Sequence, residues 1–299
     1  MSSNAQVLTL LETAEGQQIE LVGLPDLPIS KSVRLALQGH GWVTREAAEK
    51  AVERLADVFL LTMVRTRVGV ESWARRGAGE YFSSYLSEVE RASGQRVLND
   101  SVGPTVYESS PPPRFESFNM RATIGATAEY VVKSFRSLAT TEIELTDRER
   151  VAIDLFNASF FEPAADTRLL VLVMAIQPLI EPAQRPPDSV ALVNAFIDKA
   201  RTSLPEPERK SLSNALQLLR HESYRDAGRR LAQQRLGEAV YAGQSASSFF
   251  DYCYTLRNRL VHGGDIRKAR EASASVVMEL ERFVSELLTW RFVGTTGSD

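Results

Sequence analysis

Three side chains near the end of the chain have the types and spacing that acid–base chemistry on a phosphate needs. The stretch "YTLRNRLVHGG" places Arg257 five residues and Asn258 four residues before His262. Imidazole takes up and releases a proton near neutral pH, and guanidinium donates paired hydrogen bonds to phosphate oxygens. His262 is therefore a candidate for half of a catalytic pair, and an exposed residue at a helix end is the alternative.

The residues around this stretch have the apolar spacing of a helix from 246 to 262. Asn258 and His262 are four residues apart, so they share a face of that helix. Gly263 and Gly264 follow directly, and glycine adopts the left-handed conformation that commonly ends a helix. Two stripes run along the helix: the predicted core stripe is Phe249, Cys253, Leu256 and Leu260, and the second is Phe250, Tyr254, Arg257 and Val261.

The text "YTLRNRLVHGG" resembles the signature of the HEPN superfamily, particularly its Apea-like and abortive-infection-like branches. That signature is an arginine, commonly followed by Asn, Asp or His, with a histidine after four to six intervening residues, near the C-terminus of a helical bundle. Arg257, Asn258 and His262 match it position by position. The resemblance covers roughly 146–293, and "RLLVLVMAIQPLIEP" also resembles a helix found upstream in that branch.

The resemblance implies a metal-independent endoribonuclease that works as a homodimer without a cofactor. Two copies of the helix would lie side by side, so that two Arg/His pairs share one cleft. The second stripe suits this arrangement, because it gives the helix something to bury beyond its own core. Phe250, Tyr254 and Val261 are the residues expected at the dimer interface.

The same resemblance gives each polar side chain a role on RNA. The 2′-hydroxyl would attack the neighbouring phosphorus, with His262 as general base or acid. Arg257 would donate hydrogen bonds to the non-bridging oxygens as charge builds there. Asn258 would orient the imidazole or the phosphate, and the product would end in a 2′,3′-cyclic phosphate.

The formal charge of the whole chain is −3, but the basic residues are unevenly distributed. From Arg209 to Arg270 there are twelve Lys and Arg against five Asp and Glu. A local basic surface on an acidic body can attract phosphates. The cations expected to track an RNA backbone are Arg259, Arg267, Lys268 and Arg270, for which a solvated basic face is the alternative.

The rest of the chain predicts an α+β fold in which an α+β N-terminal region, 1–143, precedes an all-α helical bundle, 144–299. Residues 18–24 and 32–42 have strand patterns, and 45–67 has helical spacing after Thr44. Segments 96–109 and 114–125, which flank three prolines at 111–113, are also expected to be strands. From Thr146 onward the pattern is helical and strand signals are absent, which favours a bundle.

Composition and hydropathy indicate the cellular compartment in which the protein acts. Cys253 is the only cysteine, which excludes an internal disulfide and fits a reducing cytoplasm. The most apolar run, 169–180, contains a proline and is too short to span a bilayer, and the first residues lack a signal-peptide pattern. We therefore predict a cytoplasmic protein without a membrane segment. No cluster of Asp, Glu and His indicates a metal site.

Two interpretations compete with the enzyme. HEPN domains also occur as catalytically inactive modules that bind RNA, a nucleotide or a protein partner, and Arg257 could instead form a structural ion pair with Asp251 or Glu238. If the enzyme is active, the architecture resembles bacterial antiphage or toxin effectors. That resemblance implies RNA as substrate and an inhibitory antitoxin or a trigger-sensing partner as regulator.

Overall fold

The computed structural model describes residues 4–24, 27–32, 34–70, 90–99, 106–107, 114–116, 127–263 and 265–292. The described strands are β1 (Val7–Glu12), β2 (Gln18–Leu24), β3 (Arg34–His40), β4 (Val97–Asn99), β5 (Arg114–Glu116), β6 (Val240–Tyr241) and β7 (Gln244–Ser245). The described helices are α1 (Arg45–Thr66), α3 (Ala128–Ala139), α4 (Asp147–Ser159), α5 (Ala165–Ile176), the short 3-10 helix η1 (Gln177–Leu179), α6 (Pro187–Ser203), α7 (Glu208–Leu218), α8 (Tyr224–Leu236), α9 (Ala246–His262) and α10 (Ile266–Thr289).

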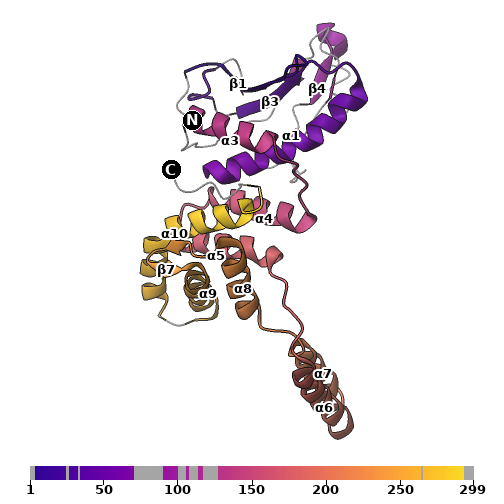
Figure 1. Ribbon diagram of the computed structural model, residues 1–299, viewed down its shortest axis with the longest axis vertical. Helices are drawn as coiled ribbons and strands as arrows, with labels where there is room; N and C mark the ends of the chain where they lie inside the picture. Colours follow the sequence, from indigo (N-terminus) through magenta and orange to yellow (C-terminus); the bar gives the residue numbers. More distant parts are fainter. Residues whose placement is uncertain are drawn as a thin grey trace.

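The N-terminal region is a three-stranded antiparallel sheet, in the order β1-β2-β3, that packs on α1 and α3 (Figure 1). Its inner face carries Leu10, Ile19 and Leu21, which are buried. Arg136 of α3 ties helix to sheet, because its Nε donates to the Leu10 carbonyl at 2.8 Å. The predicted strands at 18–24 and 32–42 are confirmed as β2 and β3, whereas β1 and α3 were not predicted.

Helix α1 begins and ends close to the predicted limits. The Thr44 hydroxyl accepts from the Ala47 amide at the N-terminus. At the other end Arg67 adopts φ +54°, and its amide donates to carbonyls of the last turn. The two strands predicted around the triple proline are short: β4 and β5 pair in parallel over three residues each. The prolines at 111–113 and most of those two segments lie outside the described residues.

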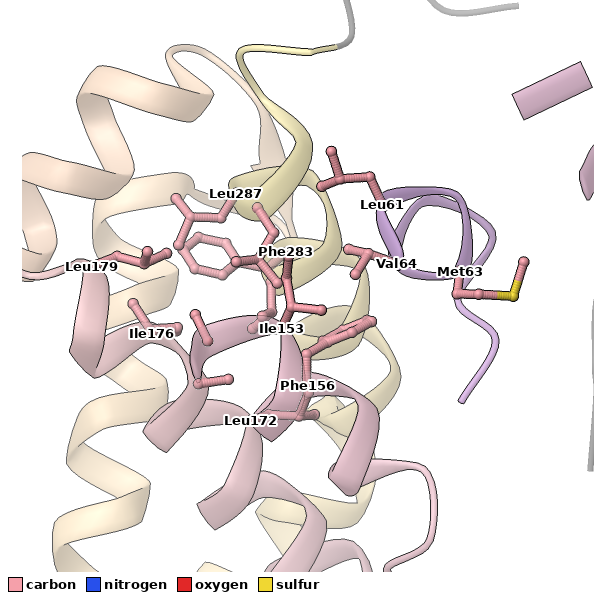
Figure 2. Close-up of a cluster of buried hydrophobic side chains, with 14 of the residues drawn as sticks. Leu61, Met63, Val64, Ile153, Phe156, Leu172, Ile176, Leu179, Phe283 and Leu287 are labelled. Carbon is pink, nitrogen blue, oxygen red and sulfur yellow. The ribbon is translucent and has the colours of Figure 1, made fainter. Parts of the chain in front are cut away.

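The sheet region and the bundle share one continuous apolar core through α1 (Figure 2). Leu61 and Val64 of α1 lie beside Phe156 of α4 and Phe283 of α10. At the same junction the Ser285 hydroxyl donates to the Val64 carbonyl at 2.7 Å. The chain is thus an α+β region followed by a helical bundle, as predicted. The boundary at 143/144 stays a prediction.

An ion pair between a partly exposed arginine and a buried carboxylate also crosses this junction. Both terminal nitrogens of Arg150 in α4 donate to the carboxylate of Asp57 in α1, at 2.7 and 2.8 Å. Burial raises the pKa of Asp57 above its ordinary value, although the Arg150 guanidinium pulls it the other way. Because the carboxylate has lost water, the pair makes the relative placement of the two helices specific.

The bundle consists of α4, α5, α8, α9 and α10, while α6 and α7 form a hairpin that projects from it (Figure 1). The predicted Thr146 cap is confirmed as a full capping box with Glu149. The expectation that strands are absent here is wrong on one point: β6 and β7 form a two-residue antiparallel hairpin before α9. Ala242 and Gly243 make its turn with positive φ, 49° and 77°.

Candidate functional site

Helix α9, which carries the candidate residues, spans the predicted range. The Ser245 hydroxyl accepts from the Ser248 amide at its N-terminus, immediately after the β6–β7 hairpin. Its last residue is His262, and Gly263 follows with φ +93°, a conformation that glycine adopts without strain. Gly264 lies outside the described residues. The hairpin and the glycine therefore fix both ends of the helix.

Aromatic packing holds the N-terminal half of α9 in the bundle. Phe249 is fully buried and lies 5.6 Å, centroid to centroid, from both Tyr241 and Phe283. Tyr241 donates its hydroxyl to Glu286 at 2.5 Å, and burial raises the pKa of that hydroxyl. The predicted core stripe is confirmed at Phe249, Cys253 and Leu256. Leu260, the fourth member of the stripe, is half-buried and packs on the same core.

The structure places Phe250 differently from the interface role expected for it. Its ring is 1 % exposed and packs inside the protomer against α8. A Cβ added at Gly228 of α8 would lie 2.1 Å from Phe250 Cζ, so the two helices approach closely because residue 228 is glycine. Tyr254 stacks on Phe250 at 5.8 Å and is half-buried. Val261, at 49 % exposed, is the one member of this trio that faces solvent broadly.

The three candidate catalytic side chains lie in the last two turns of α9, none of them buried. Arg257 and His262 are five residues apart, so their Cβ atoms point ~140° apart around the helix. A hydrogen bond offsets part of this separation: Arg257 Nη1 donates to Asn258 Oδ1 at 3.0 Å. Because Asn258 shares a face with His262, this contact draws the guanidinium toward the histidine face. Asn258 thus positions Arg257, a role that the sequence did not predict.

Of the two alternative partners considered for Arg257, Asp251 binds elsewhere, and no ion pair between Arg257 and Glu238 occurs among the described residues. Asp251 is engaged by Arg225 of α8: Arg225 Nη2 donates to Asp251 Oδ2 at 2.6 Å, and Nε donates to the other oxygen. Arg225 also reaches the Thr255 hydroxyl at 3.2 Å. These hydrogen bonds lower the pKa of Asp251. Among the described residues Arg257 forms no ion pair, so a structural ion pair does not account for it.

The four cations expected to contact RNA differ in how they are held. Arg259 is exposed at the end of α9 and, within the described part of the chain, makes no ion pair. The other three lie in the first turns of α10 and form surface pairs: Arg267 with Glu271 at 3.3 Å, Lys268 with Asp265 at 3.2 Å, and Arg270 with Asp166 at 2.8 Å. Exposed ion pairs of this kind contribute little to the stability of the fold, so an anion such as a phosphate can replace the carboxylate partner of each cation.

Two of the open hollows on the described surface adjoin the helices of the bundle and its projecting hairpin. One, of about 630 Å³, is lined only by residues between Gln184 and Asn194, at the base of the α6–α7 hairpin. The other, of about 350 Å³, is lined by residues of α8, β7 and α9. This second hollow was not predicted from the sequence, although the four-residue spacing of Arg225 and Arg229 places two cations on one face of α8.

Comparison with known proteins gives no relative: no family model, no curated protein and no solved structure matches the chain. Within the described ranges, no three side chains of metal-binding type lie together. None of the helices that the structure describes is long and apolar enough to cross a membrane.

Proposed function

We propose that the protein is a metal-independent endoribonuclease of the HEPN type, with Arg257, Asn258 and His262 at its active site. The observation that carries this proposal is the last two turns of α9. An exposed imidazole ends the helix, and an amide one turn before it holds a guanidinium that no carboxylate of the described residues neutralises. These are the groups that an in-line attack on a phosphodiester needs and that a purely structural helix end does not.

The reaction follows from the chemistry of RNA itself. His262 accepts the proton of the 2′-hydroxyl as the O2′–P bond forms, and the P–O5′ bond breaks. A protonated imidazole returns a proton to the leaving O5′, so the products are a 2′,3′-cyclic phosphate and a 5′-hydroxyl. Arg257 donates to the non-bridging oxygens, where negative charge increases in the transition state. Asn258 limits the orientations that the guanidinium can adopt.

One protomer supplies only half of this arrangement, because Arg257 and His262 project from different sides of α9. We therefore propose that the active enzyme is a homodimer, with the ends of two α9 helices facing one RNA phosphate. Two exposed apolar side chains lie at this corner: Val261 is 49 % exposed and Ile266, at the start of α10, is 47 % exposed. They give the helix ends an apolar contact beside the polar site. Tyr254 remains a secondary contact, and Phe250 is no longer part of the interface.

Histidine replacement tests the proposed chemistry. We expect purified protein to cleave single-stranded RNA in the presence of EDTA, and His262→Ala to reduce the rate by about 10²–10⁴-fold, the usual contribution of a general acid or base. His221→Ala is the matched control, since His221 is also an exposed histidine and the same purification carries the same contaminants. Equal cleavage by wild type and His262→Ala would exclude the role of His262. Loss of wild-type cleavage in EDTA would exclude the metal-free mechanism.

A second variant tests the dimer. Val261→Asp places a charge in the proposed apolar contact, so we expect a monomer by light scattering, loss of cleavage, and cooperative thermal unfolding whose midpoint no longer depends on protein concentration. Val151→Asp is the matched control, because Val151 is a helical valine that is 50 % exposed. A wild-type protein that is monomeric at all concentrations, yet cleaves RNA, would contradict the shared site.

The alternative function is a non-enzymatic module that binds RNA through the same surface. The observation that favours it is the wide angle between Arg257 and His262 within one protomer. The two proposals differ in the histidine experiment: a module binds RNA with and without His262 and releases no product ending in a cyclic phosphate.

A further inference from the structure

The hollow between α8 and α9 is a polar pocket formed by three segments of the chain. Its lining residues are Arg229 of α8, Gln244 of β7, and Ser248, Asp251, Tyr252 and Thr255 of α9. Its volume of about 350 Å³ lies at the small end of ligand sites, which suits one nucleotide or a fragment of that size. The pocket is open to solvent, because it lies on the outer face of the two helices.

Arg229 gives the pocket a net positive charge. The Arg225 guanidinium neutralises the Asp251 carboxylate and lowers its pKa, so that pair contributes no net charge. Arg229 is exposed and, within the ranges that the structure describes, forms neither an ion pair nor a hydrogen bond. Arg229 also acts electrostatically on Asp251, but because its guanidinium forms no hydrogen bond with a described residue, its N–H groups are available to bind an anion.

The remaining lining groups are suited to bind a base rather than a simple anion. Gln244 and Ser248 offer both donors and acceptors, and Asp251 keeps lone pairs that can accept from a base N–H. Tyr252 adds an aromatic ring, and bases stack on aromatic side chains in single-strand recognition. A phosphate alone would leave the Tyr252 ring and the Asp251 acceptors without a role. The combination matches a nucleotide, which carries a phosphate, a polar edge and an aromatic face.

The pocket lies on the same face of α9 as the candidate active site. Asp251, Thr255, Asn258 and His262 fall within ~60° of one another around the helix, since each residue turns 100°. Asp251 precedes His262 by about 16 Å along the axis. A single RNA strand spans that length in a few nucleotides, and α9 is a continuous helix between the two positions.

We infer that this pocket is a nucleotide subsite for single-stranded RNA, located a few nucleotides from the phosphate at His262. Arg229 binds the phosphate of that nucleotide, and Gln244, Ser248 and Asp251 bind the edge of its base. The subsite selects which sequences reach the cleavage position. This inference rests on the proposed ribonuclease function for its place in the reaction, but binding in the pocket does not depend on cleavage.

A binding measurement tests the subsite in the His262→Ala background, in which RNA stays intact. The probe is a fluorescein-labelled single-stranded oligoribonucleotide of about ten nucleotides, followed by anisotropy. Arg229→Ala removes the cation, and Ser248→Met fills the pocket without changing charge. We expect each to weaken binding about tenfold. Lys210→Ala, which removes an exposed cation from α7, is the control and should change affinity less than about twofold.

Salt dependence separates the roles of these two residues. Arg229→Ala should lower the slope of log affinity against log salt by about 0.7, the value for one phosphate contact on a single strand, whereas Ser248→Met should leave the slope unchanged. The subsite is excluded if the His262→Ala protein fails to bind the probe. It is also excluded if both pocket variants bind the probe as tightly as the His262→Ala protein does. If binding depends on the pocket but wild-type protein never cleaves RNA, the ribonuclease proposal fails and the subsite stands.

Discussion

The two halves of α9 differ in almost every property that governs a residue's role. From Ala246 to Leu256 the helix buries five side chains against the β6–β7 hairpin, α8 and α10. From Arg257 to His262 it buries none, and its polar groups reach one another or solvent. The first half is a rigid support, and the second is a short exposed segment held by that support. A site placed in this way can change its chemistry without loss of the fold.

The largest effect on stability is expected from the centre of the buried half. Phe249→Ala removes a ring that contacts Tyr241 and Phe283 and leaves a cavity. We expect a loss of about 3–5 kcal/mol in the free energy of unfolding, measured by urea denaturation. Phe249→Leu, which keeps most of the volume, should lose clearly less. Equal losses in the two variants would contradict the assignment of Phe249 as a packed core residue.

A smaller loss is expected where α8 approaches α9. Gly228→Ala places a methyl group against the Phe250 ring, and overpacking of this kind costs about 1–3 kcal/mol. Helix propensity alone would favour alanine by about 1 kcal/mol, so a net loss reports the clash. Phe250→Leu in the same chain should recover part of the loss, as a double-mutant cycle in urea would show. A Gly228→Ala protein that is more stable than wild type would contradict the close approach.

The Arg225–Asp251 ion pair at the edge of the pocket should contribute still less to the free energy of unfolding. Arg225→Ala breaks a pair whose side chains are 49 % and 28 % exposed, so we expect a loss of about 0.2–1 kcal/mol near neutral pH. The folded state lowers the pKa of Asp251 below its ordinary 3.8, so the pair stabilises the protein above that value and this contribution disappears as pH falls through the folded-state pKa. Urea titrations of both proteins should therefore converge in acid. A constant difference at all pH values would show that the pair is not responsible.

The smallest change in stability is expected in the exposed half of α9. Asn258→Ala and His262→Ala should each alter the free energy of unfolding by no more than about 0.5 kcal/mol, because neither side chain is buried. Asn258→Ala also removes the acceptor that positions Arg257, so cleavage should fall although the fold is unchanged. Thermal unfolding beside an RNA cleavage assay tests this separation. Loss of stability in parallel with loss of cleavage would assign these residues to the scaffold.

The elements that the sequence predicts well are those whose signals are local. The helix at 45–67 and the helix after Thr146 combine a hydroxyl cap with apolar residues three and four apart, and both occur as expected. The β6–β7 hairpin has only two residues in each strand, too few for an alternating pattern. Strand β1 pairs with β2 along its length. Its stability depends on this neighbouring strand, which the residues of β1 alone do not reveal.

The candidate site shows the same limit. Helical periodicity places Phe250 on a second stripe of α9, but it does not identify the surface that covers this stripe. The covering surface is Gly228 of α8, a residue whose lack of a side chain gives no apolar signal. Likewise, Asp251 binds Arg225 on another helix rather than Arg257 on its own, because a spacing of six residues leaves two side chains ~120° apart around a helix.

Cys253 lies at the middle of the buried half of α9, where it is 0 % exposed and burial raises the pKa of its thiol to about 12. Only the thiolate reacts with alkylating reagents. In the folded protein Cys253 is therefore protected in two ways, because a reagent cannot reach the sulfur and because the thiol stays protonated. The rate at which a maleimide labels the chain consequently reports how often this helix leaves the core. The molecule contains its own probe of local opening, with no engineered label.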